Sequence, residues 1–307
     1  MIARLGWSLG LFIGSLMVGV ALSRGGLLTE VRADRIIRFV VKWISPVTGC
    51  LSFWRLAISG STLITLPLLG CAISVSTLLP AWLYSRMAGF SKPQTGSFLT
   101  CAMFSNIGFL GVFVAFALGG EVGYGFATLY MLSFSPCFYL IGFAIAKRCG
   151  HQASTAFPDP DESGELRFYP FVGLLIGLGL SLARVPRPGV YEIVNHTLIP
   201  LGTACYLVAI GSQLHLEPPG RRLASCLAMG AIKFWYSPLV AWILVSCFQL
   251  TGIARVAVLI QASMPVAISP LMLPLLFGLD RKLSSALFLV TTLLAIPWLV
   301  IYLPLIR

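Results

Sequence analysis

The chain has 307 residues, of which 58% are apolar and only 10% are charged, and its formal net charge is +11. A soluble domain carries about 25% charged residues and exposes too much surface to be covered by so few polar side chains, so the composition excludes an ordinary soluble fold. The basic residues lie in short segments between apolar runs, which is typical of residues that set membrane topology rather than of a nucleic-acid interface. We therefore expect an all-α integral membrane protein that contacts the lipid bilayer and binds no nucleic acid.

About 20 mostly apolar residues are needed for a helix to cross roughly 30 Å of hydrocarbon. The first such run follows Arg4 and ends in Ala21-Leu22-Ser23, as a secretory signal would, but its length and its counterpart in the second half favour a retained helix. In chain order, the apolar runs predict ten membrane-spanning helices at residues 4–23, 36–55, 61–85, 96–118, 122–147, 168–184, 189–213, 222–249, 254–277 and 282–304.

Basic residues are distributed unevenly over the loops between these helices. With ten crossings, thirteen Lys and Arg residues lie on one side and six on the other, termini included. The richer side is expected to be cytoplasmic, which places both termini on the non-cytoplasmic side. The longest polar segment, residues 148–167, is then a cytoplasmic linker between two halves.

The two halves repeat each other at an offset of about 160 residues. Residues 102–107 align with 262–267, and residues 118–121 align with 277–280, while the glycines of 10–14 recur in 173–177. Five helices are an odd number, so the second repeat, 168–307, enters the membrane from the side opposite to the first, 1–147. Such inverted repeats are associated above all with secondary transporters, although a duplicated scaffold without transport remains an alternative.

A substrate site is expected near the midplane, where broken helices expose backbone groups. The ninth predicted helix carries Pro265, Pro270 and Pro274, each of which removes a backbone donor. In the fourth helix Asn106 precedes two glycines that weaken helix propensity, although an Asn in a bundle can also simply join helices. The expected substrate-binding residues are Ser105, Asn106, Ile107, Gln261, Ser263, Pro265, Val266 and Lys233.

Lys233 is the one ionisable residue predicted deep within a span, where a charge is costly and by default functional. All ten Asp and Glu residues are placed in loops or at helix ends, so we expect no carboxylate-based proton relay. The remaining positive charge suits an organic anion. The eight cysteines are spaced irregularly within apolar runs and indicate no disulfide framework, and we expect no metal and no cofactor.

Three stretches resemble the auxin efflux carrier family. Residues 106–111 resemble its Asn-Thr-Gly-Phe-Leu-Gly motif, with Ile107 in place of the Thr, and residues 262–267 and 209–214 resemble its second crossover and the end of its seventh helix. The resemblance implies ten helices with crossed, unwound fourth and ninth helices. It also implies a scaffold of helices 1, 2, 6 and 7 that dimerises, an elevator-like transport unit of helices 3–5 and 8–10, and small carboxylate substrates. The short linker suggests a bacterial member in the inner membrane, and the missing Thr hydroxyl leaves the substrate open.

The sequence thus predicts a secondary transporter of a small organic anion. A sodium-coupled carrier of the bile acid symporter type, which shares the architecture, remains an alternative, as does a membrane sensor that keeps the pocket without moving solute. No cluster of a nucleophile with a base is placed within the membrane, so an enzyme is not expected.

Overall fold

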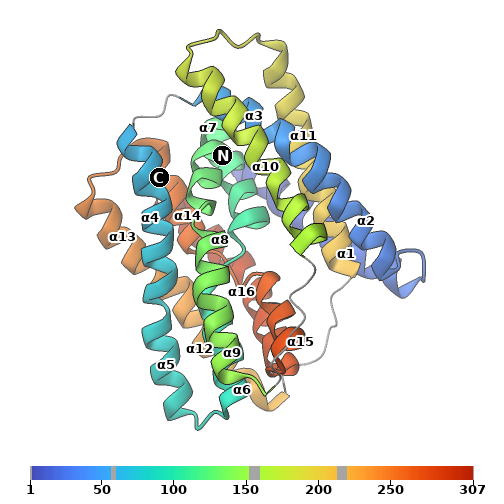
Figure 1. Cartoon of the computed structure of the whole chain (residues 1–307), viewed down its shortest axis with the longest axis vertical. Coiled ribbons are helices and arrows are strands. Elements are labelled where there is room, and N and C mark those ends of the chain that lie inside the picture. Colours follow the sequence, from blue (N-terminus) through green and yellow to red (C-terminus); the bar gives the residue numbers. More distant parts are fainter. Residues whose placement is uncertain (1, 57–59, 152–159, 213–219, 307) are drawn as a thin grey trace. The chain divides into compact units, whose positions relative to one another are not determined.

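The computed structural model describes residues 2–56, 60–151, 160–212 and 220–306, and this part of the chain is helical, with one isolated bridge in place of a sheet (Figure 1). Several helices continue through π-helical or 3-10 turns, labelled η. In chain order the elements are α1 (Ile2–Arg24), α2 (Glu30–Phe39), η1 (Val40–Ile44), α3 (Ser45–Arg55), α4 (Gly60–Ser76), α5 (Leu78–Met87), α6 (Lys92–Met103), η2 (Ile107–Gly111), α7 (Val112–Met131), α8 (Phe134–Pro136), η3 (Cys137–Gly142), α9 (Phe143–Cys149), α10 (Pro160–Leu182), α11 (Val190–Ser212), η4 (Gly220–Arg222), α12 (Leu223–Ala231), η5 (Ile232–Tyr236), α13 (Ser237–Cys247), α14 (Gly252–Ala262), η6 (Ser269–Met272), α15 (Leu273–Phe277) and α16 (Arg281–Leu305).

Six helical stretches among the described residues are long and apolar enough to cross a membrane. They are Val31–Arg55, Ser61–Met87, Ile107–Cys149, Val190–Ser212, Leu223–Cys247 and Arg281–Leu305. Shorter apolar helices cover Gly10–Arg24, Tyr169–Leu182 and Gly252–Ala262. The multi-pass helical character predicted from composition is confirmed, while ten crossings in two inverted repeats stay a prediction.

The second and sixth predicted helices begin well before the predicted residues, the largest differences at any helix start. The second predicted helix, 36–55, begins at Glu30, because the Thr29 hydroxyl accepts a hydrogen bond from the backbone N–H of Arg32 and caps the helix. The sixth begins at Pro160 rather than at 168, since a proline fits the first turn of a helix, where no intrahelical N–H bond is needed. Part of the predicted linker is therefore helical, and its residues 152–159 lie outside the described ranges.

The chain divides into two compact units. Unit 1 comprises Met1–Ser59, Val112–Thr128 and Pro158–His215, and unit 2 comprises Gly60–Gly111, Leu129–Phe157 and Leu216–Arg307. The boundary between them falls at the start of α7 and again near its end, so the first part of α7 belongs to unit 1 although the chain on either side of it belongs to unit 2.

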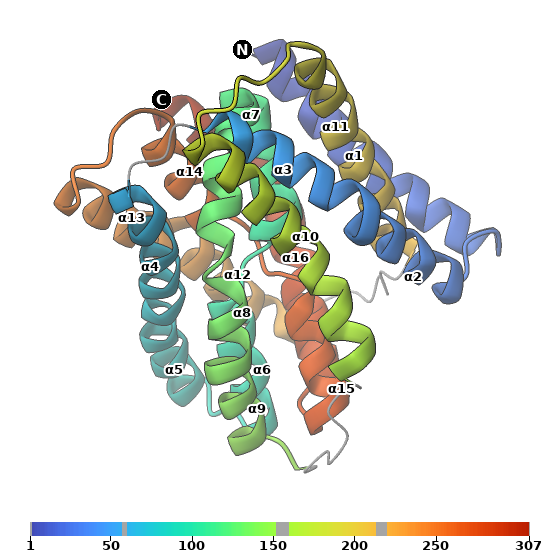
Figure 2. The same ribbon diagram turned by 45° about the horizontal axis from the view of Figure 1, so that its top comes forward.

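Glycines bring the helices of unit 1 close together. In this unit α1 packs along α11, and α10 packs along α3, as both views show (Figures 1 and 2). A Cβ atom on Gly173 or Gly177 of α10 would overlap the backbone of α3 at Pro46 and Cys50, so only glycine permits this approach. In contrast, Gly10 of α1 has open space around it, so the matching glycine patterns of α1 and α10 play different parts.

Unit 2 has an aromatic core at its centre. Phe104, Phe138 and Phe143 are buried in one cluster with residues of α6, α9 and α15. The rings of Phe104 and Phe138 meet edge to face with centroids 5.1 Å apart. This cluster packs directly behind the point where α6 ends, which fixes the segment that follows α6.

Candidate functional site

Two helices of unit 2 are interrupted where the sequence predicts broken helices. The helix α6 ends at Met103, and Phe104 follows in an extended conformation. The helix α14 ends at Ala262, and regular structure resumes only at η6. The cause in the second segment is Pro265, which has no N–H to donate back into the helix and disfavours helical geometry at Met264 before it.

The two unwound segments cross and hydrogen-bond to each other. Ser105 and Val266 form an antiparallel bridge. The Asn106 backbone N–H donates to the Pro265 carbonyl oxygen at 2.8 Å, and the Ala267 N–H donates to the Phe104 carbonyl oxygen at 3.0 Å. Each segment thus satisfies backbone groups that the other helix would otherwise leave unpaired in an apolar surrounding. We call this arrangement the crossover, meaning residues 104–106 and 263–268.

The side chain of Asn106 lies at the end of the crossover, and only one of its two amide atoms, Oδ1, forms a hydrogen bond with the described residues. Its Oδ1 accepts from the backbone N–H of Leu110 at 3.5 Å, and its backbone carbonyl accepts from Gly111 at 3.0 Å. In the part of the chain that the structure describes, no acceptor pairs with its Nδ2. Two N–H groups on a buried amide are the donors that a carboxylate would require.

Lys233 reaches the same place from the neighbouring helix. Its side chain is fully buried, and Nζ donates to the carbonyl oxygen of Ala102 at 2.6 Å and to Oγ of Ser105 at 2.8 Å. The ammonium group therefore lies against the end of α6 and the first residue of the bridge. A positive charge at this point attracts an anion toward the crossover, although its hydrogen bonds go to the protein itself.

The other predicted site residues lie behind the crossover and support it. Gln261 is fully buried, and its Nε2 donates to the carbonyl oxygen of Ile107 at 3.0 Å. Ser263 is bonded within its own turn, to the carbonyl oxygen of Ile260 at 2.9 Å. The N–H of Val266 donates to the Thr291 hydroxyl at 3.2 Å. The structure thus gathers all eight predicted residues around one crossing, where Ser105 is half-buried and Asn106 is buried.

Two hydroxyl groups that the sequence analysis did not single out brace the ends of the interrupted helices. Thr77 Oγ1 donates to the carbonyl oxygen of Ala102 at 3.0 Å, and Ser237 Oγ donates to that of Ala262 at 2.7 Å. The two donors lie 160 positions apart in the sequence, and so do the two acceptors, which is the offset between the repeated sequences. The offset itself was the signal that could have revealed them.

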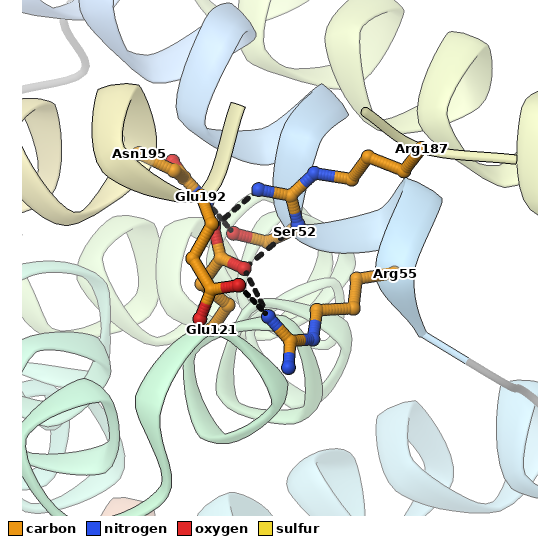
Figure 3. A network of polar contacts seen from close by, with 6 residues as sticks. All are labelled: Ser52, Arg55, Glu121, Arg187, Glu192 and Asn195. Atoms are coloured by element: carbon orange, nitrogen blue, oxygen red, sulfur yellow. Dashed lines mark hydrogen bonds and ion pairs between the residues drawn. The ribbon is translucent and has the colours of Figure 1, made fainter. Parts of the chain in front are cut away.

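A second polar cluster lies within unit 1 and encloses Glu121, one of the acids that the sequence analysis placed in loops or at helix ends (Figure 3). The side chain of Glu121 follows Gly120, whose φ of +59° bends α7, and is only 1% exposed. Arg187 donates to both of its oxygens, at 2.7 and 2.8 Å, and Asn195 Nδ2 donates to Oε1 at 2.6 Å. Arg55 donates to Oε2 at 3.2 Å. The sequence analysis placed Glu121 at a helix end, but it did not predict that other helices enclose this end.

The cluster holds its charges in balance. Arg55 also pairs with Glu192 at 2.9 Å, and Asn195 also donates to Ser52 Oγ at 2.9 Å (Figure 3). Two guanidinium groups thus face two carboxylates. Only the Glu121–Arg187 pair is buried, and loss of either of its partners would leave an uncompensated buried charge. The cluster fixes the bend of α7 to α3, α11 and the segment between α10 and α11, and it offers no surplus charge for a ligand.

The chain is similar to proteins that carry the name of transporters. A profile of the family described as membrane transport protein matches residues 162–303. An uncharacterized transporter of Methanothermobacter thermautotrophicus is 23% identical over 91% of this chain and 91% of its own length. Another of Methanocaldococcus jannaschii is 25% identical over 87% of this chain and 88% of its own length. The match runs through the second interrupted helix and Lys233.

Proposed function

We propose that the chain, whose residues 162–303 match a profile of membrane transport proteins, is a secondary transporter of the auxin efflux carrier type, and that its substrate is a small organic anion, a carboxylate, which binds at the crossover. The observation that carries the proposal is the crossover itself. There the buried Asn106 follows Ser105, whose hydroxyl accepts a hydrogen bond from the buried Lys233, and backbone groups of the two crossing segments bond to each other. A carboxylate accepting from Nδ2 next to this charge gains a charge-assisted hydrogen bond.

The transport movement we propose is elevator-like, in a fold of ten crossings and two inverted repeats. The matched hydroxyl bonds of Thr77 and Ser237 support the repeat, because they brace equivalent helix ends at one offset. The separate compactness of the two units supports a scaffold and a moving part. We further propose a homodimer formed through the scaffold, in a bacterial inner membrane, with both termini on the non-cytoplasmic side.

A thermal-shift screen of the purified protein tests the substrate class. Mono- and dicarboxylates of two to six carbons are compared with neutral sugars and amines of similar size, at two pH values, with and without sodium. A ligand present at about 100 times its Kd stabilises the folded state by about 2.7 kcal/mol, which a melting curve resolves. We expect stabilisation by one or more carboxylates and by none of the neutral or cationic compounds.

Flux then separates a transporter from a sensor. The stabilising carboxylate, radiolabelled, is offered to proteoliposomes preloaded with the same unlabelled compound, and counterflow is measured. We expect accumulation of label above protein-free liposomes. Binding without counterflow would favour a sensor that keeps a carrier-like pocket, and stabilisation by amines alone would refute the anion assignment.

A further inference from the structure

The interruption of α6 frees the carbonyl oxygen of Ala102, which accepts a hydrogen bond from Lys233. In an uninterrupted helix the Ala102 carbonyl would accept the N–H of Asn106, four residues later. That N–H instead donates to Pro265, and the freed carbonyl lies at the C-terminal end of α6, where the helix carries partial negative charge. The amino group of Lys233 binds this carbonyl and Ser105 Oγ together. Carbonyl and hydroxyl oxygens are the donor types that hard metal cations prefer.

The second interrupted helix shows what Lys233 adds. At α14 the equivalent carbonyl, that of Ala262, is satisfied by the Ser237 hydroxyl. At α6 the equivalent hydroxyl, that of Thr77, already donates to Ala102. The position that corresponds to Lys233 at the same offset is Ile73, which is 2% exposed. In the second half of the chain, a hydroxyl alone donates to the carbonyl oxygen at the end of the interrupted helix. In the first half, Lys233 donates to the equivalent oxygen in addition to the hydroxyl, and it brings a positive charge.

Among the residues that the structure describes, this charge has no acidic partner. None of the ion pairs among the described residues includes Lys233. In unit 2 the Asp280 carboxylate caps α16 by accepting from the N–H of Leu283 at 2.9 Å. The oxygens of the α6 end are therefore what stabilises the buried ammonium, as they would stabilise a bound metal cation.

We propose that Lys233 is the resident cation of the crossover: its ammonium takes the position between the Ala102 carbonyl and Ser105 Oγ that a coupling sodium ion would require, so that this transporter works without sodium. The inference rests on the proposed function for its consequence, namely that the cation at the crossover is supplied by the protein rather than brought in with each substrate. That Lys233 fills the cation position is inferred from its two hydrogen bonds alone.

The test uses melting temperature without substrate, so it does not depend on the transport assignment. Wild-type protein, Lys233→Ser and Lys233→Met are compared in sodium chloride and in N-methyl-D-glucamine chloride at equal ionic strength. Lys233→Ser removes the ammonium and opens the space beside the Ala102 carbonyl and Ser105 Oγ, into which sodium with its water can enter. Lys233→Met fills the space without charge or oxygen and serves as the matched control, and Lys233→Arg keeps the charge.

For the wild type we expect no difference between the two salts. For Lys233→Ser we expect a saturable rise of roughly 2–4 °C with sodium, as for a ligand that binds only the folded state, and for Lys233→Met none. A saturable sodium response of the wild type would overturn the proposal. So would a Lys233→Ser protein that ignores sodium, because the oxygens would then not form a cation position. If the proposed carboxylate flux fails while these shifts hold, the function is wrong and the resident cation stands.

Discussion

The N–H of Asn106 and the carbonyl oxygen of Pro265 lie 2.8 Å apart and form a hydrogen bond between two segments from different halves of the chain. Neither interrupted helix could keep its unwound residues in an apolar environment without the other, because unpaired backbone groups are costly there. The crossing therefore stabilises both interrupted helices of unit 2, and we propose it as the place where polar groups meet a ligand.

Gly111 is required for close packing beside the crossover. A Cβ at this position would overlap the amide oxygen of Gln261, whose other amide atom holds the Ile107 carbonyl. We expect Gly111→Ala to lower the free energy of unfolding by about 1–3 kcal/mol, the usual cost of overpacking. Gly108→Ala is the matched control, since its Cβ would meet only the sulfur of the flexible Met131 side chain. Equal melting temperatures for the two variants would contradict this expectation and would show that the Gln261 side chain moves aside without cost.

The two bracing hydroxyls should differ in importance. Ser237→Ala leaves the buried carbonyl of Ala262 without this donor, and an unsatisfied buried acceptor costs about 1–3 kcal/mol. Thr77→Val should cost clearly less, because Lys233 still donates to the Ala102 carbonyl. Thermal melting of both variants in one detergent gives the comparison. The opposite order would mean that Lys233 does not bind the end of α6 as the structure shows.

The buried carboxylate of Glu121 should be far more important than an exposed one. Glu121→Gln leaves Arg187, itself 9% exposed, without its charge partner, and we expect a loss of about 3 kcal/mol or more. Asp34→Asn is the control, because Asp34 pairs with Arg38 at 2.7 Å on the exposed surface of α2, where such pairs contribute about 0–1 kcal/mol.

A double variant separates burial from charge balance. Glu121→Gln combined with Arg187→Met removes both charges, and we expect it to be more stable than Glu121→Gln alone. If the double variant is instead less stable by the full sum of the two single losses, the two side chains act independently and the cluster in Figure 3 is not a unit.

Local chemistry explains which parts of the site were predictable. Three prolines within ten residues, at 265, 270 and 274, favour an interrupted helix, and Asn106 with its glycines marks the equivalent stretch, so both segments and Lys233 could be identified from the sequence. The internal offset of 160 also contained the positions of Thr77 and Ser237, since equivalent helix ends need equivalent donors. The offset does not determine where a side chain points, so it could not predict that Lys233 donates its hydrogen bonds to the protein itself.

The cluster around Glu121 could not be predicted for a different reason. A glutamate after a Gly-Gly pair indicates a helix end, and a helix end in a membrane protein usually meets water or headgroups. Its burial depends on Arg55, Arg187 and Asn195, which come from three other segments of unit 1. No pattern of spacing relates these residues to Glu121. Only the packing of α3, α10 and α11, which glycines such as Gly173 permit, encloses the bend of α7.

Carboxylate counterflow by Asn106→Ala in proteoliposomes tests the central claim most directly. Ser246→Ala is the control, because Ser246 is exposed on α13 and bonds only within its own helix, to Trp242. With equal amounts of folded protein, we expect Ser246→Ala to match the wild type. A hydrogen bond to a charged group contributes about 1.5–3 kcal/mol, so Asn106→Ala should lose about tenfold or more of the flux. Wild-type flux by Asn106→Ala would contradict a substrate site at the crossover.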